Sequence, residues 1–267
     1  MTGPAAGIHP AGDQAGAAPL VFAHRGASAA LPEHTLPAYQ RALQEGADGL
    51  ECDVRLTRDG HLVCIHDRRL ERTSNGRGLV GDHRLDELAE LDFGSWHGTG
   101  PAGVLTLQRL LVEVRGAGRP VRLLIETKHP SRQGPQVERQ LLALLHRHRL
   151  AVPAPDDPVR VTVMSFSAMA LRRVRALAPA LPTVLLLQVL PPRPAVGRLL
   201  FGARIAGPSI GLVRSRPGLV PALHAAGHQV YVWTVNDPAD LALVRRQQVA
   251  GVITDYPGET LTRLGRS

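Results

Sequence analysis

Short, almost continuously apolar runs alternate with helical patterns along this chain from residue 19 onward. Strands that are covered on both faces have such uninterrupted apolar runs. The segments between them place apolar residues three and four positions apart, which is typical of helices that bury one face. The alternation predicts repeated strand–helix units around a parallel sheet. The eight expected strands cover residues 19–25, 48–54, 121–128, 160–166, 182–189, 203–211, 229–235 and 250–255.

The number of these units sets the expected fold class. Eight strand–helix units predict an α/β fold, the (β/α)8 TIM barrel, and the chain has 267 residues where such a barrel needs about 250. We therefore expect residues 19–267 to form a single barrel domain. Residues 1–18 are rich in Gly, Ala and Pro, and we expect them to form a disordered tail.

One segment interrupts the alternation after the second expected strand. Residues 58–60, Arg-Asp-Gly, are typical of a hairpin turn. We expect residues 61–67 to return antiparallel, as an extension of the sheet and not as a further barrel strand. Residues 68–105 are loop-rich with one short helical pattern. They predict a small insertion on the face where barrel enzymes carry their sites.

Charge and composition limit the expected partners. The formal net charge of +8 suits an anionic partner. The arginines are scattered along helical segments, however, and no basic run carries the interleaved aromatic residues of a nucleic-acid platform. We expect a phosphorylated small molecule as the partner and no nucleic acid.

The chain shows no signal-peptide pattern and no run of about 20 apolar residues. These absences predict a cytoplasmic protein without stable membrane insertion. Cys52 and Cys64 fall inside strand-like runs, and two buried thiols in a reducing compartment are the expected state. No heptad pattern indicates an oligomeric state.

Three carboxylates fall near the ends of two expected strands. Glu51 and Asp53 are two residues apart in an apolar run, so both side chains point to the same side of the strand. Glu126 and Lys128 repeat this spacing in the third strand. Two like charges held together need a cation or a shared proton. The all-oxygen set predicts a hard cation such as Mg²⁺ or Ca²⁺.

Two histidines end strand-like runs beside this set. His24 ends the first expected strand and His66 ends the antiparallel return, which favours acid–base chemistry over two isolated structural histidines. Arg25 follows His24, and its guanidinium could hold a phosphate. Gly26 belongs to a small-residue turn, which we interpret as a place where a ligand approaches the backbone. Trp233, near the end of the seventh strand, is equally compatible with core packing and with a site role.

These residues lie in segments that resemble the glycerophosphodiester phosphodiesterase family. The segments follow the family's order from Leu20 to Pro257. A single His-Arg-Gly or Glu-x-Asp would be weak evidence, but their joint occurrence at these separations is specific. The matching segments are AHRGASAALPEHTLPAYQRAL, GADGLECDVRLTRDGHLVCIHDRRLERTSNGRG, LDFGSWHG, LLIETKHP, VMSF, VYVWTVND and GVITDYP.

The resemblance implies a metal-dependent hydrolysis of glycerophosphodiesters to sn-glycerol 3-phosphate and an alcohol, a reaction of glycerol and lipid metabolism. It implies that one divalent cation, Mg²⁺ or Ca²⁺, is bound by Glu51, Asp53 and Glu126. It further implies that His24 and His66 act as general base and general acid, in an order the sequence leaves open. In the same way it implies substrate-binding roles for Arg25 and Lys128 at the phosphate and for Trp233 at the glycerol end.

One position departs from the family pattern. The family usually has Pro-Glu-Asn-Thr where this chain has His34 between Glu33 and Thr35, which leaves the role of residue 34 open. Two alternatives to the expected function remain: a lysophospholipase D-like phosphodiesterase that acts on lipids, and a non-catalytic phosphoester-binding barrel. The absence of an anchor favours water-soluble substrates, and the complete set of site residues favours catalysis.

Overall fold

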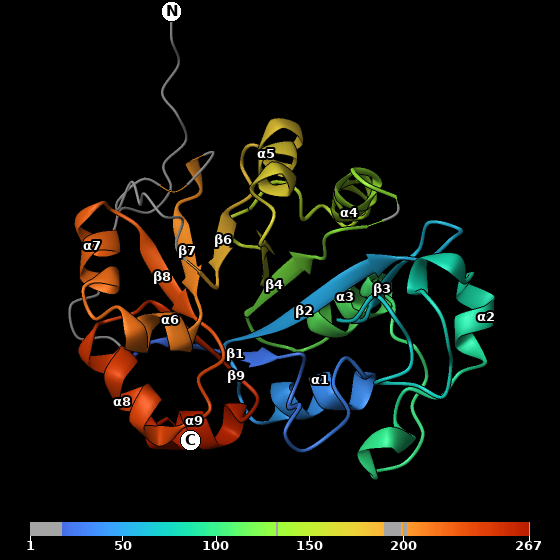
Figure 1. Ribbon diagram of the computed structural model, residues 1–267, viewed down its shortest axis with the longest axis horizontal. Coiled ribbons are helices and arrows are strands. Elements are labelled where there is room, and N and C mark those ends of the chain that lie inside the picture. The colour runs from blue at the N-terminus through green and yellow to red at the C-terminus, as the bar shows by residue number, and fades with distance from the viewer. Residues whose placement is uncertain (1–17, 132, 190–198, 200–201, 267) are drawn as a thin grey trace, which may run out of the picture.

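Eight parallel strands close into a barrel in the computed structural model of this chain (Figure 1). Closure is direct, because β1 pairs with both β2 and β9, so the predicted (β/α)8 class is confirmed. The structure describes residues 18–131, 133–189, 199 and 202–266, and the predicted tail therefore falls almost wholly outside the described residues. The barrel strands are β1 (Leu20–His24), β2 (Gly49–Leu56), β4 (Val121–Thr127), β5 (Val159–Ser165), β6 (Thr183–Leu187), β7 (Ile205–Pro208), β8 (Gln229–Val232) and β9 (Gly251–Thr254).

Helices surround the barrel, and several begin at a residue whose side chain caps the helix. The side chains of Thr35, Thr106, Ser167 and Ser209 each accept a hydrogen bond from a backbone N–H of the first turn. The expected cap at Asp237 is also present. The helices are α1 (Leu36–Gln44), α3 (Leu107–Arg115), α4 (Gln136–Arg147), α5 (Ala168–Leu177), α6 (Ile210–Ser215), α7 (Leu219–Ala225), α8 (Pro238–Arg246) and α9 (Pro257–Arg263).

The segment after β2 leaves the barrel as the sequence predicted. Strand β3 (Leu62–Cys64) pairs antiparallel with the end of β2, with Val54 opposite Cys64. It is followed by two short 3-10 helices, η1 (Val80–Asp82) and η2 (Ser95–His97), and by helix α2 (Leu85–Ala89). Strand β3, η1, α2 and the loops between them share a small apolar core of their own, made by Val63, Ile65, Leu70, Val80, Leu88 and Phe93.

Alternate residues of the strands fill the inside of the barrel. The interior cluster contains Phe22, Leu124, Met164, Val184, Leu186, Ile205, Tyr231 and Ile253. Two residues further along β1 and β4, on the same side of the strand, stand His24 and Glu126. The register places His24 beside Glu51 and Asp53 beside Glu126. The apolar interior therefore forms the floor on which the polar residues at the open end stand.

Three strands end earlier than the sequence suggested. The expected strand 203–211 ends at Pro208, because Ser209 caps α6 and the chain turns into that helix. The expected strands 182–189 and 229–235 end at Leu187 and Val232. The fold class is unaffected, since each strand keeps its place in the sheet.

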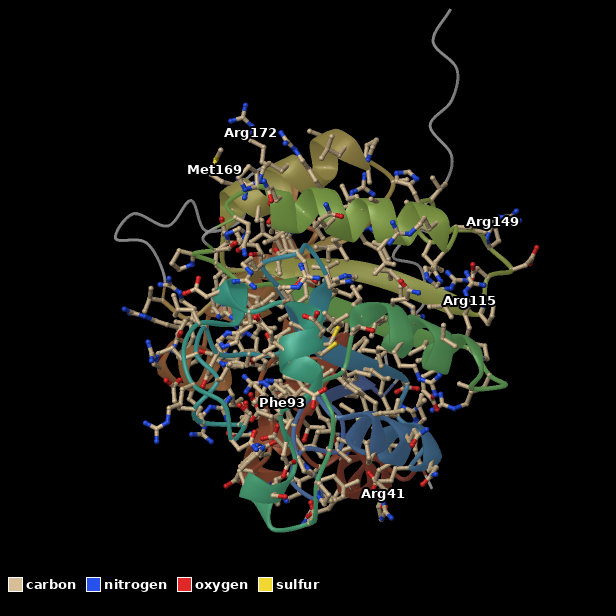
Figure 2. The ribbon with its side chains drawn as sticks, turned by 90° about the vertical axis from the view of Figure 1, so that its right-hand side faces the viewer. Arg41, Phe93, Arg115, Arg149, Met169 and Arg172 are labelled. Atoms are coloured by element: carbon tan, nitrogen blue, oxygen red, sulfur yellow. The ribbon has the colours of Figure 1, made fainter. Side chains whose placement is uncertain are left out.

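The surface charge and the two cysteines also agree with the sequence. Arg41 on α1, Arg149 after α4 and Arg172 on α5 lie far apart at the periphery in Figure 2, in agreement with scattered positive charge. Cys52 and Cys64 are buried free thiols, as expected. Within the described part of the chain, no helix has both the length and the apolar character needed to cross a membrane.

Gly49 provides a test of this packing. A Cβ at Gly49 would lie 2.6 Å from the carbonyl oxygen of Arg122 and 2.7 Å from the Phe22 ring. We expect Gly49→Ala to lower the free energy of unfolding by about 1–3 kcal/mol, because backbone and ring must both move. Urea denaturation followed by circular dichroism measures the loss. The matched control is Gly103→Ala, whose added methyl group meets nothing within 4 Å; equal stability of the two variants would contradict the packing described here.

Candidate active site

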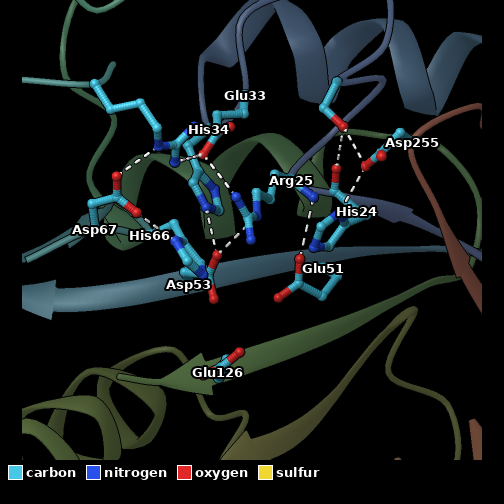
Figure 3. Close-up of polar contacts among 12 residues, drawn as sticks. His24, Arg25, Glu33, His34, Glu51, Asp53, His66, Asp67, Glu126 and Asp255 are labelled. Carbon is cyan, nitrogen blue, oxygen red and sulfur yellow. Dashed lines mark hydrogen bonds and ion pairs between the residues drawn. The ribbon is translucent and has the colours of Figure 1, made fainter. Parts of the chain in front are cut away.

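Three buried carboxylates converge at the carboxyl end of β2 and β4. Glu51, Asp53 and Glu126 are only 2%, 1% and 6% exposed. One oxygen from each lies within 4.8 Å of the others, and these residues form the acidic group with metal-ligand spacing in the described structure. Figure 3 shows the three side chains pointing toward a common space. The structure therefore brings together the three carboxylates that the sequence singled out.

Two cationic side chains partly balance this charge. Lys128 Nζ lies 2.8 Å from Glu126 Oε1 and 3.3 Å from Asp53 Oδ1. Arg25 Nε lies 3.1 Å from Asp53 Oδ2, an ion pair without hydrogen-bond geometry, so this buried N–H has no hydrogen-bond acceptor in the described structure. Both predicted phosphate-binding residues thus stand at the carboxylates and present donors to the same space.

The pKa values show how far the negative charge of each carboxylate is balanced by its neighbours. Burial alone would raise the pKa of Asp53, but Lys128, His34 and Arg25 hold it well below its usual range. Burial and then the charge of Asp53 raise the pKa of Glu51 well above its usual range. The same two causes raise the pKa of Glu126 to about 8. Three carboxylates against two cations leave a negative excess that a hard cation with oxygen ligands would relieve.

His24 is held by a carboxylate from the last strand of the barrel. Its Nδ1 lies 2.6 Å from Asp255 Oδ1, directly after β9. Asp255 is itself fixed by Asn236 Nδ2 at 2.5 Å and by Ser28 Oγ at 2.9 Å. Although burial opposes ionisation, the hydrogen bond and charge of His24 lower the pKa of Asp255 to about 2. An ionised Asp255 fixes the ring, so that Nε2 is left for chemistry.

His66 has the same kind of partner, supplied from the insertion. Its Nδ1 lies 2.7 Å from Asp67 Oδ1. Arg72 Nε donates to Asp67 Oδ2 at 2.6 Å, and its two terminal nitrogens donate to both oxygens of Glu33 at 2.8 Å. Glu33 also accepts from Arg25. Arg72 therefore links the partner of one predicted histidine to the partner of a predicted phosphate-binding arginine.

His34, which departs from the family pattern, lies directly beside the carboxylates. His34 is buried and has a positive φ of 61°. Its Nε2 lies 2.9 Å from Asp53 Oδ2 and its Nδ1 lies 2.8 Å from the Tyr39 hydroxyl, which in turn donates to the Glu51 carbonyl at 3.1 Å. Burial lowers the pKa of His34 despite the nearby Asp53 charge. His34 thus fixes the Asp53 carboxylate and, through Tyr39 of α1, is linked to the backbone of Glu51.

Trp233 packs at the edge of the barrel interior, and its role toward a substrate stays a prediction. Its ring packs partly buried against the interior cluster, and Nε1 donates to the Gly207 carbonyl at 2.6 Å. Its exposed side meets Phe166 edge-on, with the ring centroids 5.4 Å apart. Phe166 is 43% exposed, and Lys128 Nζ lies 5.9 Å from the centre of its ring. The two aromatic rings form a wall beside the lysine.

Four supporting residues escaped the sequence analysis. Asp67 had a usable signal, since it directly follows His66, and Asp255 ends a barrel strand with a polar residue. Glu33 and Arg72 gave none, because they are 39 positions apart and meet only in the folded chain.

A closed barrel with an acidic site, two cations and two carboxylate-bound histidines at its carboxyl end defines a (β/α)8-barrel enzyme. Residues 24–259 match the glycerophosphoryl diester phosphodiesterase family. A probable glycerophosphodiester phosphodiesterase 1 of Mycobacterium tuberculosis is 51% identical, with 91% of each chain covered. A Bacillus subtilis glycerophosphodiester phosphodiesterase is 34% identical, with 89% of this chain and 84% of the relative covered.

Solved structures agree with these relatives. An Oleispira antarctica phosphodiesterase in complex with the product sn-glycerol-3-phosphate has a TM-score of 0.80 at 27% identity, with 93% of this chain and 97% of that chain covered. A putative glycerophosphoryl diester phosphodiesterase from Silicibacter pomeroyi has a TM-score of 0.79 at 28% identity, with 94% and 96% covered. The chain belongs to the glycerophosphoryl diester phosphodiesterase family, and its predicted class, a phosphoric diester hydrolase, is confirmed.

Cation binding at the three carboxylates can be tested by thermal unfolding. We expect Mg²⁺ or Ca²⁺, at about 100 times its dissociation constant, to raise the Tm by about 5–10 °C, since the cation binds only the folded site. Glu126→Gln should abolish the increase, whereas Glu259→Gln, on the exposed side of α9, should retain it. An equal increase in all three proteins would place the cation elsewhere.

Proposed function

We propose that this enzyme hydrolyses glycerophosphodiesters to sn-glycerol 3-phosphate and an alcohol, with one divalent cation, Mg²⁺ or Ca²⁺. The observation that carries the proposal is the convergence of two carboxylate-bound histidines on a buried site of three carboxylates, Arg25 and Lys128. The Oleispira antarctica relative, which holds sn-glycerol-3-phosphate, supports the proposed product.

In this proposal Glu51, Asp53 and Glu126 hold the cation, which when bound polarises a phosphoryl oxygen. Arg25 and Lys128 bind the phosphate, and their donors neutralise the charge that grows on its oxygens during the reaction. Trp233 packs against the glycerol end, where its ring and that of Phe166 form the aromatic wall. The substrate is a small-molecule phosphodiester.

The two histidines move the protons. Burial lowers the pKa of His66 to about 4, so its ring is neutral near pH 7 and its Nε2 can accept a proton from the water molecule that attacks phosphorus. His24, paired with the ionised Asp255, then donates a proton to the departing alcohol. The sequence left the order of the two histidines open, and the lowered pKa of His66 supports His66 as the base and His24 as the acid.

The reaction can be tested by release of glycerol 3-phosphate from glycerophosphocholine. We expect activity that EDTA removes and that Mg²⁺ or Ca²⁺ restores. His24→Ala should lower kcat by about 10²–10⁴-fold, because the leaving alcohol loses its proton donor. Glu51→Gln should lose the metal-dependent activity while remaining folded.

The control for these variants is Glu259→Gln, which should keep full activity. Full activity of Glu51→Gln and His24→Ala would contradict the proposed roles. Hydrolysis of lysophospholipids but not of glycerophosphocholine would instead favour the lysophospholipase D-like alternative. Inactivity on both substrates would favour a phosphoester-binding barrel.

The proton assignment predicts a pH profile. As pH rises through the lowered pKa of His66, about 4, the base becomes neutral, so this titration should raise kcat/KM up to about pH 5. If His66 were the acid, kcat/KM would fall about tenfold for each pH unit above that value. Initial rates between pH 4 and pH 8 distinguish the two, and activity recovered at pH 7 after acid exposure excludes unfolding as the cause.

A further inference from the structure

A second cleft lies beside the active site, between the insertion and the loop after β4. The space between its walls, including the part open to solvent, is about 340 Å³. Arg55 on β2 and Arg68 after β3 line it from one side, and Ser131 and Gln133 line it from the loop after β4. The remaining lining residues are aliphatic, glycine or proline, so two guanidinium groups face the cleft and no acidic side chain lines it.

Neither arginine is neutralised within the cleft. Arg55 donates through Nε and Nη2 to the carbonyl oxygen of His66, at 2.9 and 2.7 Å, which leaves its other terminal nitrogen for a ligand. Arg68 makes no side-chain hydrogen bond or ion pair with any residue that the structure describes. The positive charge of Arg68 also acts unfavourably on that of Arg55. An oxyanion between them would relieve this repulsion and accept charge-assisted hydrogen bonds.

The cleft stands next to the reacting groups. Arg55 follows Asp53 by two residues on β2, so it lies about 7 Å further along the same side of that strand. Its guanidinium holds the backbone of His66, and Ser131 follows Lys128 by three residues. A phosphodiester bound at Arg25 and Lys128 could therefore place its alcohol part at the mouth of the cleft.

We propose that the cleft binds an oxyanion, a carboxylate or phosphate group, on the alcohol part of the substrate, and so favours glycerophosphodiesters with an anionic alcohol. This inference rests on the proposed function, because it assumes a phosphodiester bound at the acidic site. Arg68 is the specificity-determining residue: it supplies a charge that nothing else in the described structure uses. A cationic alcohol without an oxyanion gains nothing from the cleft.

Two substrates isolate this effect. Glycerophosphoserine differs from glycerophosphoethanolamine only by a carboxylate on the alcohol. We expect a kcat/KM about tenfold higher for the serine compound in the wild type, through KM, as one charge-assisted hydrogen-bonded pair would give. Arg68→Gln should remove most of that preference and change the rate on the ethanolamine compound less than twofold.

The matched control is Arg69→Gln, whose side chain is 62% exposed, pairs with Glu71 and does not line the cleft; it should keep the preference. Equal rates on the two substrates in the wild type, or an equal loss on both in Arg68→Gln, would overturn the proposal. Failure of the wild type on both substrates would instead contradict the proposed function.

Calorimetry keeps the two proposals separable. Titration of His24→Ala, whose turnover should be slowed about 10²–10⁴-fold, is expected to show tighter binding of glycerophosphoserine than of glycerophosphoethanolamine. Arg68→Gln in that background should remove the difference. Titration with inorganic phosphate tests the other source of an oxyanion. If Arg68→Gln weakened phosphate binding but the two diesters bound equally, the cleft would be a site for free phosphate and the substrate proposal would be wrong.

Discussion

The burial of three carboxylates at one end of the barrel is the constraint on which the rest of the site depends. Each buried charge needs a partner, since an unpaired one is very costly. Asp53 by itself has three such partners: Arg25, His34 and Lys128. Arg25 is tied through Glu33 to Arg72 of the insertion. The need to balance the negative charges on β2 therefore determines where the loop after β1, the end of β4 and part of the insertion must lie.

The two histidines are positioned by different parts of the chain. Asp255, the partner of His24, is fixed by Ser28 and Asn236, which belong to barrel loops. Asp67, the partner of His66, is fixed by Arg72 of the insertion. The pKa of each aspartate is lowered to about 2, so both partners are charged near neutral pH. The barrel thus positions one histidine of the proposed proton-transfer pair, and the insertion positions the other.

The sequence could predict arrangements of residues that are close together in the chain, but not contacts between residues that are far apart in it. The two-residue period of a strand is local, so the shared face of Glu51 and Asp53 was predictable. The register that sets Asp53 beside Glu126 is not local, and neither is the pairing of His24 with Asp255 across 231 positions. Gly26 was interpreted as an approach point for a ligand. That interpretation stays a prediction, and the structure adds a packing reason for the glycine: φ is +90°, and a Cβ would lie 2.7 Å from the Ala38 backbone.

His34 shows how one local departure joins this charge balance. A neutral imidazole carries one N–H, and the Asp53 carboxylate accepts it at Nε2. Nδ1 is then an acceptor, so the single Tyr39 proton must serve either His34 or the Glu51 carbonyl. Asparagine, which the family usually has here, carries its donor and its acceptor on one short amide group, whereas His34 contacts Asp53 and Tyr39 through two separate ring nitrogens. His34 therefore couples Tyr39 of α1 to the Asp53 carboxylate, and the single Tyr39 hydroxyl proton is shared between His34 and the backbone of Glu51.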